Sequence, residues 1–284
     1  MSHWVLLVAP LALASFVMLF GFVGCRLDSI GEAGNQPDPD PDPDPDPELE
    51  QYLIDVTNNP NVVGYWRLGE PPGETTAVDS KGDNDGTYVG GVTLGQPGLL
   101  VVDPDTAAQF DGSTGFMNVP RNDDSLNPAT FTVEAIADVA GGDDQLRAVV
   151  SSRDIDGDAQ KSGYILYASD QNKWEAWVGD GSLGAWQVVS GPDVTPGQHY
   201  LAMTYNGTTL KLYVDPVDDT PASAEVPYVP NAAQELRIGA GVNEADPLEF
   251  FNGVIDEVAV YNVDLDFSVI QTHFALATTG AAPA

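Results

Sequence analysis

The sequence predicts an all-β protein, a two-sheet antiparallel jelly-roll β-sandwich, and three observations lead to this fold class. The 284 residues include 29 Gly and 22 Pro, which indicates many turns and therefore many short strands. Short β-rich runs bounded by Gly, Asp, Asn or Pro recur along the chain without the regular repeat of a solenoid or propeller. Cys25 is the only cysteine, so no intrachain disulfide can form and a hydrophobic core must hold the fold.

The strands are predicted from alternation and turn signals. Leu210 and Leu212 face one way and Lys211 the other, as a half-buried strand requires, and the Asn-Gly pair at 206–207 is a strong hairpin signal. One helix is predicted, over residues 268–277. The predicted strands span residues 62–68, 107–110, 116–119, 131–137, 147–152, 164–168, 174–178, 186–189, 200–205, 209–214, 236–239 and 254–261.

The chain is strongly acidic, since 10 Lys and Arg stand against 43 Asp and Glu for a net charge of −33. The first 50 residues hold one basic and nine acidic residues, so the remainder carries −25 and the acidity belongs to the domain as well. Such a surface repels phosphates and no basic stripe offsets it, which excludes nucleic acid as a partner. Most of these acids are interpreted as solubilising, and a few as cation ligands.

An apolar run over residues 4–24 ends in small residues directly before Cys25. A run of this length is typical of a signal peptide or a membrane-spanning helix. Its end, Phe22-Val23-Gly24-Cys25, resembles the lipobox of bacterial lipoproteins. The resemblance implies that residues 1–24 are removed, that Cys25 is lipidated, and that the protein is exported and anchored in the membrane at the cell surface or outer membrane. An uncleaved anchor and a plain signal peptide are the alternatives.

Residues 25–49 are predicted to form a stalk. From Pro37 onward Pro and Asp alternate, which prevents helix and sheet pairing and favours an extended polyproline II segment or a disordered tether. Either form would hold the domain, predicted over residues 50–277, away from a surface. Residues 278–284 are predicted to be a disordered tail.

Motifs along the domain occur in the order found in bacterial laminin-G-like, concanavalin A-like domains. They begin with Tyr65-Trp66-Arg67-Leu68-Gly69-Glu70 and end with a strand that contains Asp256. The chain therefore resembles that family over nearly all of residues 50–277, and the resemblance implies the concanavalin A-like jelly roll. The motifs lie at residues 65–70, 79–90, 110–113, 131–135, 196–198, 204–208, 212–215 and 251–261.

The resemblance also implies a metal site, because members of this family often hold one structural Ca²⁺ where an early loop meets the final strand. On this chain the ligands would be Asp79 and Asn84 in the early loop and Asp256 in the final strand. Ca²⁺ takes about six to eight oxygen ligands, which suits carboxylate and amide side chains. The alternative is that Asp79 caps a turn and Asp256 accepts hydrogen bonds from backbone amides.

Five aromatic residues, Tyr164, Tyr167, Trp174, Trp177 and Trp186, lie close together in the sequence. Aromatic rings stack on sugar rings, so Trp186, Trp177 and Trp174 are the candidate ligand-binding residues. Trp174 and Trp177 are three residues apart, so on one strand they lie on opposite faces and at least one belongs to the core. Trp186 is the first choice for an exposed platform, because nearby turn residues place it at a strand end.

We find no catalytic set in the sequence and expect the protein not to be an enzyme. Segment 244–249 has the E-x-D-x-x-E spacing of some retaining glucanases of this fold, but Pro247 interrupts it and it is interpreted as a loop. The expected function is recognition of glycans or another extracellular protein by a domain displayed through a lipid anchor. A structural adhesion module without a small ligand and, less favoured, a glycoside hydrolase or lyase are the alternatives.

Overall fold

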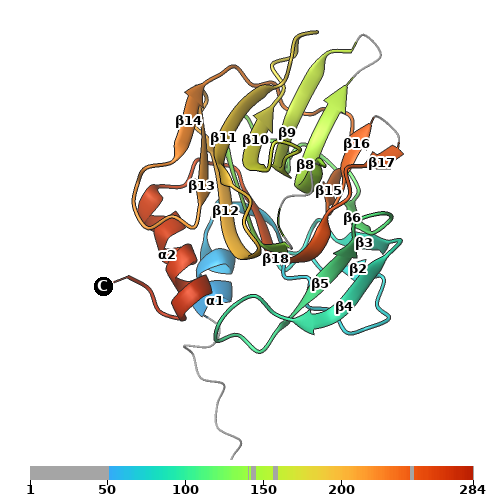
Figure 1. Cartoon of the computed structure of the whole chain (residues 1–284), viewed down its shortest axis with the longest axis vertical. Coiled ribbons are helices and arrows are strands. Elements are labelled where there is room, and N and C mark those ends of the chain that lie inside the picture. Colours follow the sequence, from blue (N-terminus) through green and yellow to red (C-terminus); the bar gives the residue numbers. More distant parts are fainter. Residues whose placement is uncertain (1–50, 140, 142–144, 156–158, 244–245, 284) are drawn as a thin grey trace, which may run out of the picture. The chain divides into compact units, whose positions relative to one another are not determined.

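The computed structural model of the protein describes residues 51–283 apart from 140, 142–144, 156–158 and 244–245 (Figure 1). Cys25, the apolar run before it and the predicted stalk therefore lie outside the described residues. The part described contains two helices and eighteen strands, most of them in two antiparallel sheets, which confirms the predicted β-sandwich. Neither of these helices has the length and apolar character of a membrane-spanning segment.

The first sheet has the strand order β14-β13-β12-β7-β18-β5-β4, and β1 pairs with β18 beyond the part of that strand that pairs with β5. A bulge in β18 between Asp256 and Ala259 interrupts its pairing with β7 and places Glu257 at a positive φ of 52°. The strands are β1 (Val62–Trp66), β4 (Val92–Pro97), β5 (Thr106–Asp111), β7 (Phe131–Val139), β12 (Gly197–Tyr205), β13 (Thr209–Val214), β14 (Ala222–Glu225) and β18 (Asn252–Tyr261).

The second sheet has the order β11-β10-β9-β8-β15-β6-β3-β2. A separate hairpin, β16 (Gly241–Asn243) and β17 (Asp246–Leu248), lies beside β8 (Figure 1). The strands of this sheet are β2 (Thr76–Ala77), β3 (Gly86–Val89), β6 (Phe116–Val119), β8 (Arg147–Ile155), β9 (Lys161–Ala168), β10 (Lys173–Val178), β11 (Gln187–Asp193) and β15 (Leu236–Ile238).

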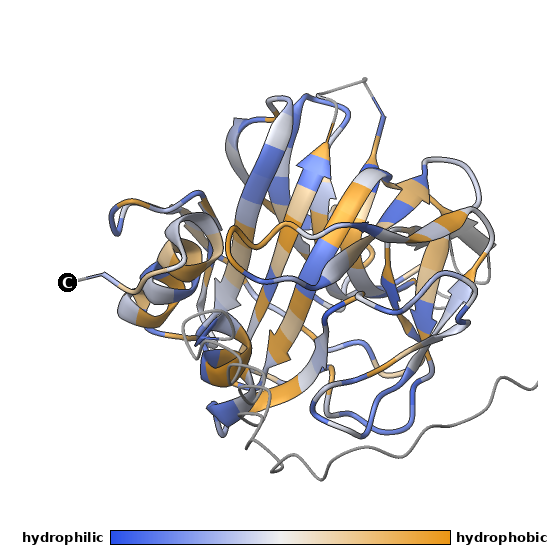
Figure 2. Cartoon of the chain, turned by 90° about the horizontal axis from the view of Figure 1, so that it is seen from below, coloured by the Kyte–Doolittle hydropathy of each residue, from blue (hydrophilic) through white to orange (hydrophobic). Residues whose placement is uncertain are grey.

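The main core fills the space between the two sheets. Its largest side chains, which include Trp66, Trp174 and Phe131, are fully buried. Figure 2 shows apolar residues along the central strands and hydrophilic residues over much of the connecting loops. Burial of apolar surface on this scale replaces the disulfides that the sequence lacks.

Two helices cover the outer face of the first sheet. Val56 of α1 (Gln51–Asn58) and Ile270 of α2 (Phe267–Thr279) pack with Ile136 of β7 in a second apolar cluster. The central strands of the first sheet are therefore buried on both faces. The outer face of the second sheet has no helix in the described structure, and this leaves it as the broad strand surface of the domain.

Each predicted strand overlaps a strand of the structure, but the short strands β2, β3, β4, β14, β16 and β17 were not predicted. Segment 244–249, interpreted as a loop, contributes the second strand of the hairpin, so that interpretation is wrong for β17. The predicted helix 268–277 is α2, which runs two residues into the predicted tail and ends at Gly280. Gly280 adopts a φ of 74° and donates its N–H to the carbonyl of Leu276.

Candidate functional site

Trp174 belongs to the core, so its prediction as a ligand-binding residue is wrong. Along β10, Trp174 and Ala176 face the space between the sheets while Trp177 faces outward. Trp174 has no exposed surface and packs edge-on against His199 at 5.5 Å between ring centroids. The alternation of side chains along a strand explains why only one of the two tryptophans can be at the surface.

Trp177 and Trp186 form an aromatic pair on the outer face of the second sheet. Their ring centroids lie 6.5 Å apart, and both side chains are partly exposed. Tyr167 of β9 packs edge-on against Trp177 at 5.2 Å. Val188, which lies opposite Trp177 in the β10–β11 pairing, is 38% exposed and extends the apolar surface. We call this surface, from Tyr167 to Val188, the aromatic face.

Carboxylates are fixed beside the aromatic face by hydrogen bonds. The Trp177 indole N–H donates to Glu175 at 2.8 Å, and the Ser190 hydroxyl donates to the second oxygen of the same carboxylate at 2.9 Å. The Gln187 side chain donates to Asp180 at 3.0 Å. These contacts hold polar acceptors next to apolar rings, the combination that a sugar with one apolar face and a polar rim requires.

A guanidinium completes the aromatic face, although no motif in the sequence marks it for this role. Arg153 of β8 lies 5.6 Å from the centre of the Trp186 ring and contacts the Tyr167 hydroxyl at 3.1 Å. Its Nη1 is also 3.4 Å from the Glu249 carboxylate, to which the Tyr167 hydroxyl donates a hydrogen bond. Burial, followed by the negative charge of Glu249, raises the pKa of Tyr167 well above its usual value.

The E-x-D-x-x-E segment can be placed only in part. Glu244 lies outside the described residues, and Glu249 is engaged with Arg153 and Tyr167. Glu249 is therefore a neighbour of the aromatic face and holds the Arg153 side chain across it. In sequence the two residues are 96 positions apart, so only the fold brings them together.

The predicted calcium ligands Asp79 and Asn84 belong to one hydrogen-bonded loop. Asp79 is buried and its two carboxylate oxygens accept the backbone N–H groups of Tyr65 (2.8 Å), Lys81 (2.9 Å), Asp83 (3.3 Å) and Asn84 (3.0 Å). The side-chain amide of Asn84 donates to a carbonyl of β1 at 3.0 Å. This arrangement is the loop-closing alternative that the sequence left open.

Asp256 lies in a different environment. One oxygen accepts the N–H of Leu99 at 2.8 Å, and the other is buried without a hydrogen-bond partner in the described structure. Burial, with the neighbouring charge of Glu257, raises the pKa of Asp256 well above its usual value. Arg67 contacts Asp105 at 3.1 Å and Glu257 at 3.2 Å, and its positive charge opposes the rise in the pKa of Asp256.

The three predicted ligands therefore do not form one coordination shell in this structure. Asp256 bonds to Leu99, whereas Asp79 bonds within its own loop and to β1, and the described residues contain no group of three or more His, Cys, Asp or Glu arranged to hold a metal. The residues fit Ca²⁺ only in part, through the unpartnered oxygen of Asp256.

The fold defines the chain as a β-sandwich of the concanavalin A type. The laminin-G-type model described as the concanavalin A-like lectin/glucanases superfamily matches residues 111–271, more than half of the chain, and the chain belongs to this family. No curated protein matches the sequence.

Solved structures with the same fold include two kinds of protein. Trypanosoma rangeli sialidase in complex with sialic acid is 14% identical, with a TM-score of 0.58 over 82% of this chain and 38% of that one. The botulinum neurotoxin serotype D binding domain is 12% identical, with a TM-score of 0.54 over 75% of this chain and 51% of that one. The binding domain of botulinum neurotoxin DC in complex with SialylT is 11% identical, with a TM-score of 0.56 over 79% and 53%. The chain thus spans about half or less of these structures, and at such identities the likeness concerns the fold alone.

Proposed function

We propose that the domain is a non-catalytic recognition module that binds glycans on the aromatic face of the second sheet. The observation that carries this proposal is the pairing of Trp177 with Trp186 on an outer strand surface, with Glu175 and Arg153 fixed at its edges. Indole rings stack on the apolar face of a sugar, while the carboxylate and guanidinium hydrogen-bond to its hydroxyls. Lipidation at Cys25 and display at the cell surface belong to the same proposal.

One further observation supports recognition rather than hydrolysis. The carboxylates beside the aromatic face are held by internal hydrogen bonds, Glu175 by Trp177 and Ser190 and Glu249 by Tyr167. Hydrolysis by retention needs two carboxyl groups about 5–5.5 Å apart with access to the glycosidic bond. The similar structures in complex with sialic acid and SialylT make sialylated oligosaccharides an obvious part of a test panel.

A protein partner is the second candidate, and it rests on one observation. Leu183 is 69% exposed in the loop that leads to Trp186, and Val188 on the aromatic face is 38% exposed. Apolar patches of this kind also bind other proteins.

A glycan panel probed with the purified protein, with and without Ca²⁺, separates these candidates. We expect binding to a restricted set of glycans that falls at least about tenfold, or about 1.4 kcal/mol, in Trp177→Ala and in Trp186→Ala, because each change removes a ring that stacks on the sugar. Phe267→Ala, which removes a partly exposed aromatic from the opposite side of the domain, is the matched control and should bind normally. Absence of binding to every glycan, or equal binding by all three variants, would reject the proposal.

A further inference from the structure

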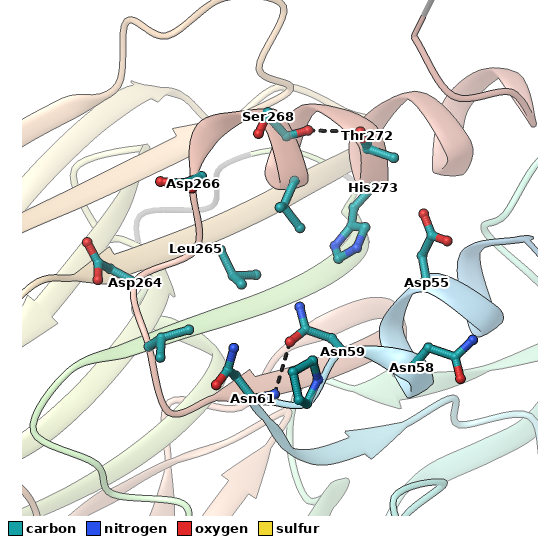
Figure 3. A pocket seen from close by; sticks show the side chains of 13 residues that line it. Asp55, Asn58, Asn59, Asn61, Asp264, Leu265, Asp266, Ser268, Thr272 and His273 are labelled. Carbon is teal, nitrogen blue, oxygen red and sulfur yellow. Dashed lines mark hydrogen bonds between the residues drawn. The ribbon is translucent and has the colours of Figure 1, made fainter.

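A hollow of about 640 Å³ lies between α1, α2 and the loops that join these helices to the first sheet (Figure 3). Asp55 comes from α1, residues 59–61 from the turn after it, residues 263–266 from the loop after β18, and His273 from α2. We call this hollow the helix-side pocket. It shares no residue with the aromatic face and lies on the outer side of the other sheet, so an occupant would bind there independently of the proposed function.

The charge of the helix-side pocket is negative. Asp55, Asp264 and Asp266 line it, and its lining residues include no Lys or Arg. Asp266 stands at the N-cap position of α2 but its side chain makes no capping hydrogen bond, so the helix does not occupy this carboxylate. Leu265 and Val269 add apolar surface between the polar groups. A cationic occupant of small-molecule size matches this lining.

A buried histidine in the wall of the pocket supplies an independent polar contact. His273 is only 1% exposed and extends from α2 into the space between α2 and α1 (Figure 3). Its Nδ1 lies 2.9 Å from the Glu134 carboxylate, and Tyr52 packs against the ring at 5.5 Å. Within the described residues, both hydrogen bonds of the ring are made by Nδ1, to the two oxygens of Glu134. The ring forms part of the pocket wall, so Nε2 is free to contact a polar group of an occupant.

The chemistry of that group follows from the histidine. Because a carboxylate accepts at Nδ1, this nitrogen carries a proton, and Nε2 is an acceptor in the neutral ring and a donor in the charged ring. Burial alone lowers the pKa of His273, but the charge and hydrogen bond of Glu134, with a contribution from Asp55, raise it overall. A hydroxyl can donate or accept, so it suits Nε2 in both states, whereas an ammonium group can only donate and so suits Nε2 in the neutral ring alone.

We propose that the helix-side pocket binds an amino sugar, with its ammonium group at the Asp264 and Asp266 side and a ring hydroxyl at His273. A single metal ion does not match the pocket, because the carboxylates and histidine do not converge in a group arranged to hold one. Separate carboxylates around a wide hollow instead match a ligand that carries its positive charge and its hydroxyls several bonds apart. The acidic Pro-Asp segment of this chain is not a candidate occupant, because like charges repel.

The probes are glucosamine, glucose, N-acetylglucosamine and butylamine, titrated into the purified protein at about 150 mM salt so that long-range attraction is screened. Amide and side-chain NMR signals report both affinity and location. We expect glucosamine to shift signals of α1, α2 and the 263–266 loop, and the two neutral sugars to bind at least about tenfold more weakly because they lack the charge-assisted contact. Butylamine, which has the charge without hydroxyls, should also bind more weakly.

Asp264→Asn and Asp266→Asn are the test variants, because both side chains are exposed and their loss should leave the thermal midpoint unchanged. Together they should weaken glucosamine binding at least about tenfold. Asp170→Asn removes an equally exposed carboxylate from the β9–β10 turn and should have no effect. Equal binding of all four probes, glucosamine shifts spread over the acidic surface, or unchanged binding in the double variant would overturn the proposal. Loss of glycan binding at Trp177 and Trp186 would leave these results unaffected.

Discussion

At the scale of single residues, the face of β10 on which a tryptophan lies decides whether it can contact a ligand. Trp174 and Trp177 have the same side-chain chemistry and lie on the same strand, yet one is enclosed between the sheets and the other is on the outer face. The strand period predicts that they differ, but which of them faces outward depends on the register of β10 against β9 and β11. Arg153 and Glu249 could not be assigned to the site from sequence, because only the tertiary fold brings them together.

Replacing the buried tryptophan should affect stability rather than recognition. We expect Trp174→Ala to lower the free energy of unfolding by about 3–5 kcal/mol, since it leaves a cavity in the core. Trp186→Ala, at a partly exposed position, should change the thermal midpoint far less. Denaturant unfolding of the two variants measures both effects. A larger loss for Trp186→Ala than for Trp174→Ala would contradict the assignment of faces.

His273 should make stability depend on pH. Its pKa in the folded state is raised, because Glu134 and Asp55 outweigh the opposing effect of burial, and the faces of Tyr52 and Tyr261 enclose the ring. The folded state therefore binds the proton more tightly than the unfolded chain, whose ordinary pKa is about 6.5. This stabilisation is fully present below that pH and is lost as the pH rises through the raised folded value.

The measurement is urea unfolding of the wild type and His273→Gln at a series of pH values from about 5.5 to 8.5. The difference in unfolding free energy between the two proteins should shrink as the pH rises. His199→Gln is the comparison, because a hydrogen bond that His199 donates to Asp215 raises the pKa of a histidine that packs against Trp174 in the main core. A constant difference between wild type and His273→Gln would show that His273 does not titrate in this range.

At the scale of elements, the sequence predicts the long strands but not the shortest strands or helix α1. β12 and β13 carry clear alternation and a turn signal between them, whereas β2 has two residues and β4 includes a glycine and a proline. α1 is only eight residues long, and helices shorter than about 12–15 residues are marginal alone, so packing against α2 and the sheet stabilises it. The loop of Asp79 was correctly located, but its partners in β1 are fixed by the fold.

Calcium remains a proposal for the acidic group around Asp256. An ion there would use the unpartnered carboxylate oxygen and offset the repulsion among Asp256, Glu257 and Asp105. Stability should then rise with free Ca²⁺ by about 2.7 kcal/mol at a hundredfold excess over the dissociation constant, and Mg²⁺ should replace it poorly. Thermal melts in EDTA, Ca²⁺ and Mg²⁺ test this. Identical melting temperatures in EDTA, Ca²⁺ and Mg²⁺ would show that the Ca²⁺ site does not exist. A full Ca²⁺ response in Asp256→Ala would show that the ion binds elsewhere.

At the scale of the whole molecule, the sequence predicts an export segment and an acidic stalk before the domain, and we propose that the domain is a recognition module. The apolar run ends at the chain's only cysteine, and the Pro-Asp segment separates it from the domain. An anchored domain held off a surface suits a ligand outside the cell. The family and the sandwich followed from ordered motifs, but the ligand did not, because one sandwich hosts many functions.

The predicted lipid anchor at Cys25 can be tested by mass spectrometry. We expect the mature protein to begin at Cys25 with the mass of attached lipid, and Cys25→Ala to accumulate as an unlipidated precursor that retains residues 1–24. Intact mass spectrometry of both proteins, purified from membranes, gives the answer. An unmodified Cys25, or the same processed mass after the substitution, is incompatible with the anchor.

The most direct test of glycan recognition on the aromatic face follows the indole N–H signals of the tryptophans by NMR during titration with a glycan selected from the panel. Trp66 and Trp174 are fully buried, and the Trp66 indole donates to the carbonyl of Asn84 at 2.8 Å, so their signals are internal controls. We predict that the signals of Trp177 and Trp186 move together and saturate at one affinity, while those of Trp66 and Trp174 stay in place. Saturable glycan binding that leaves the Trp177 and Trp186 signals unmoved would contradict the proposed function.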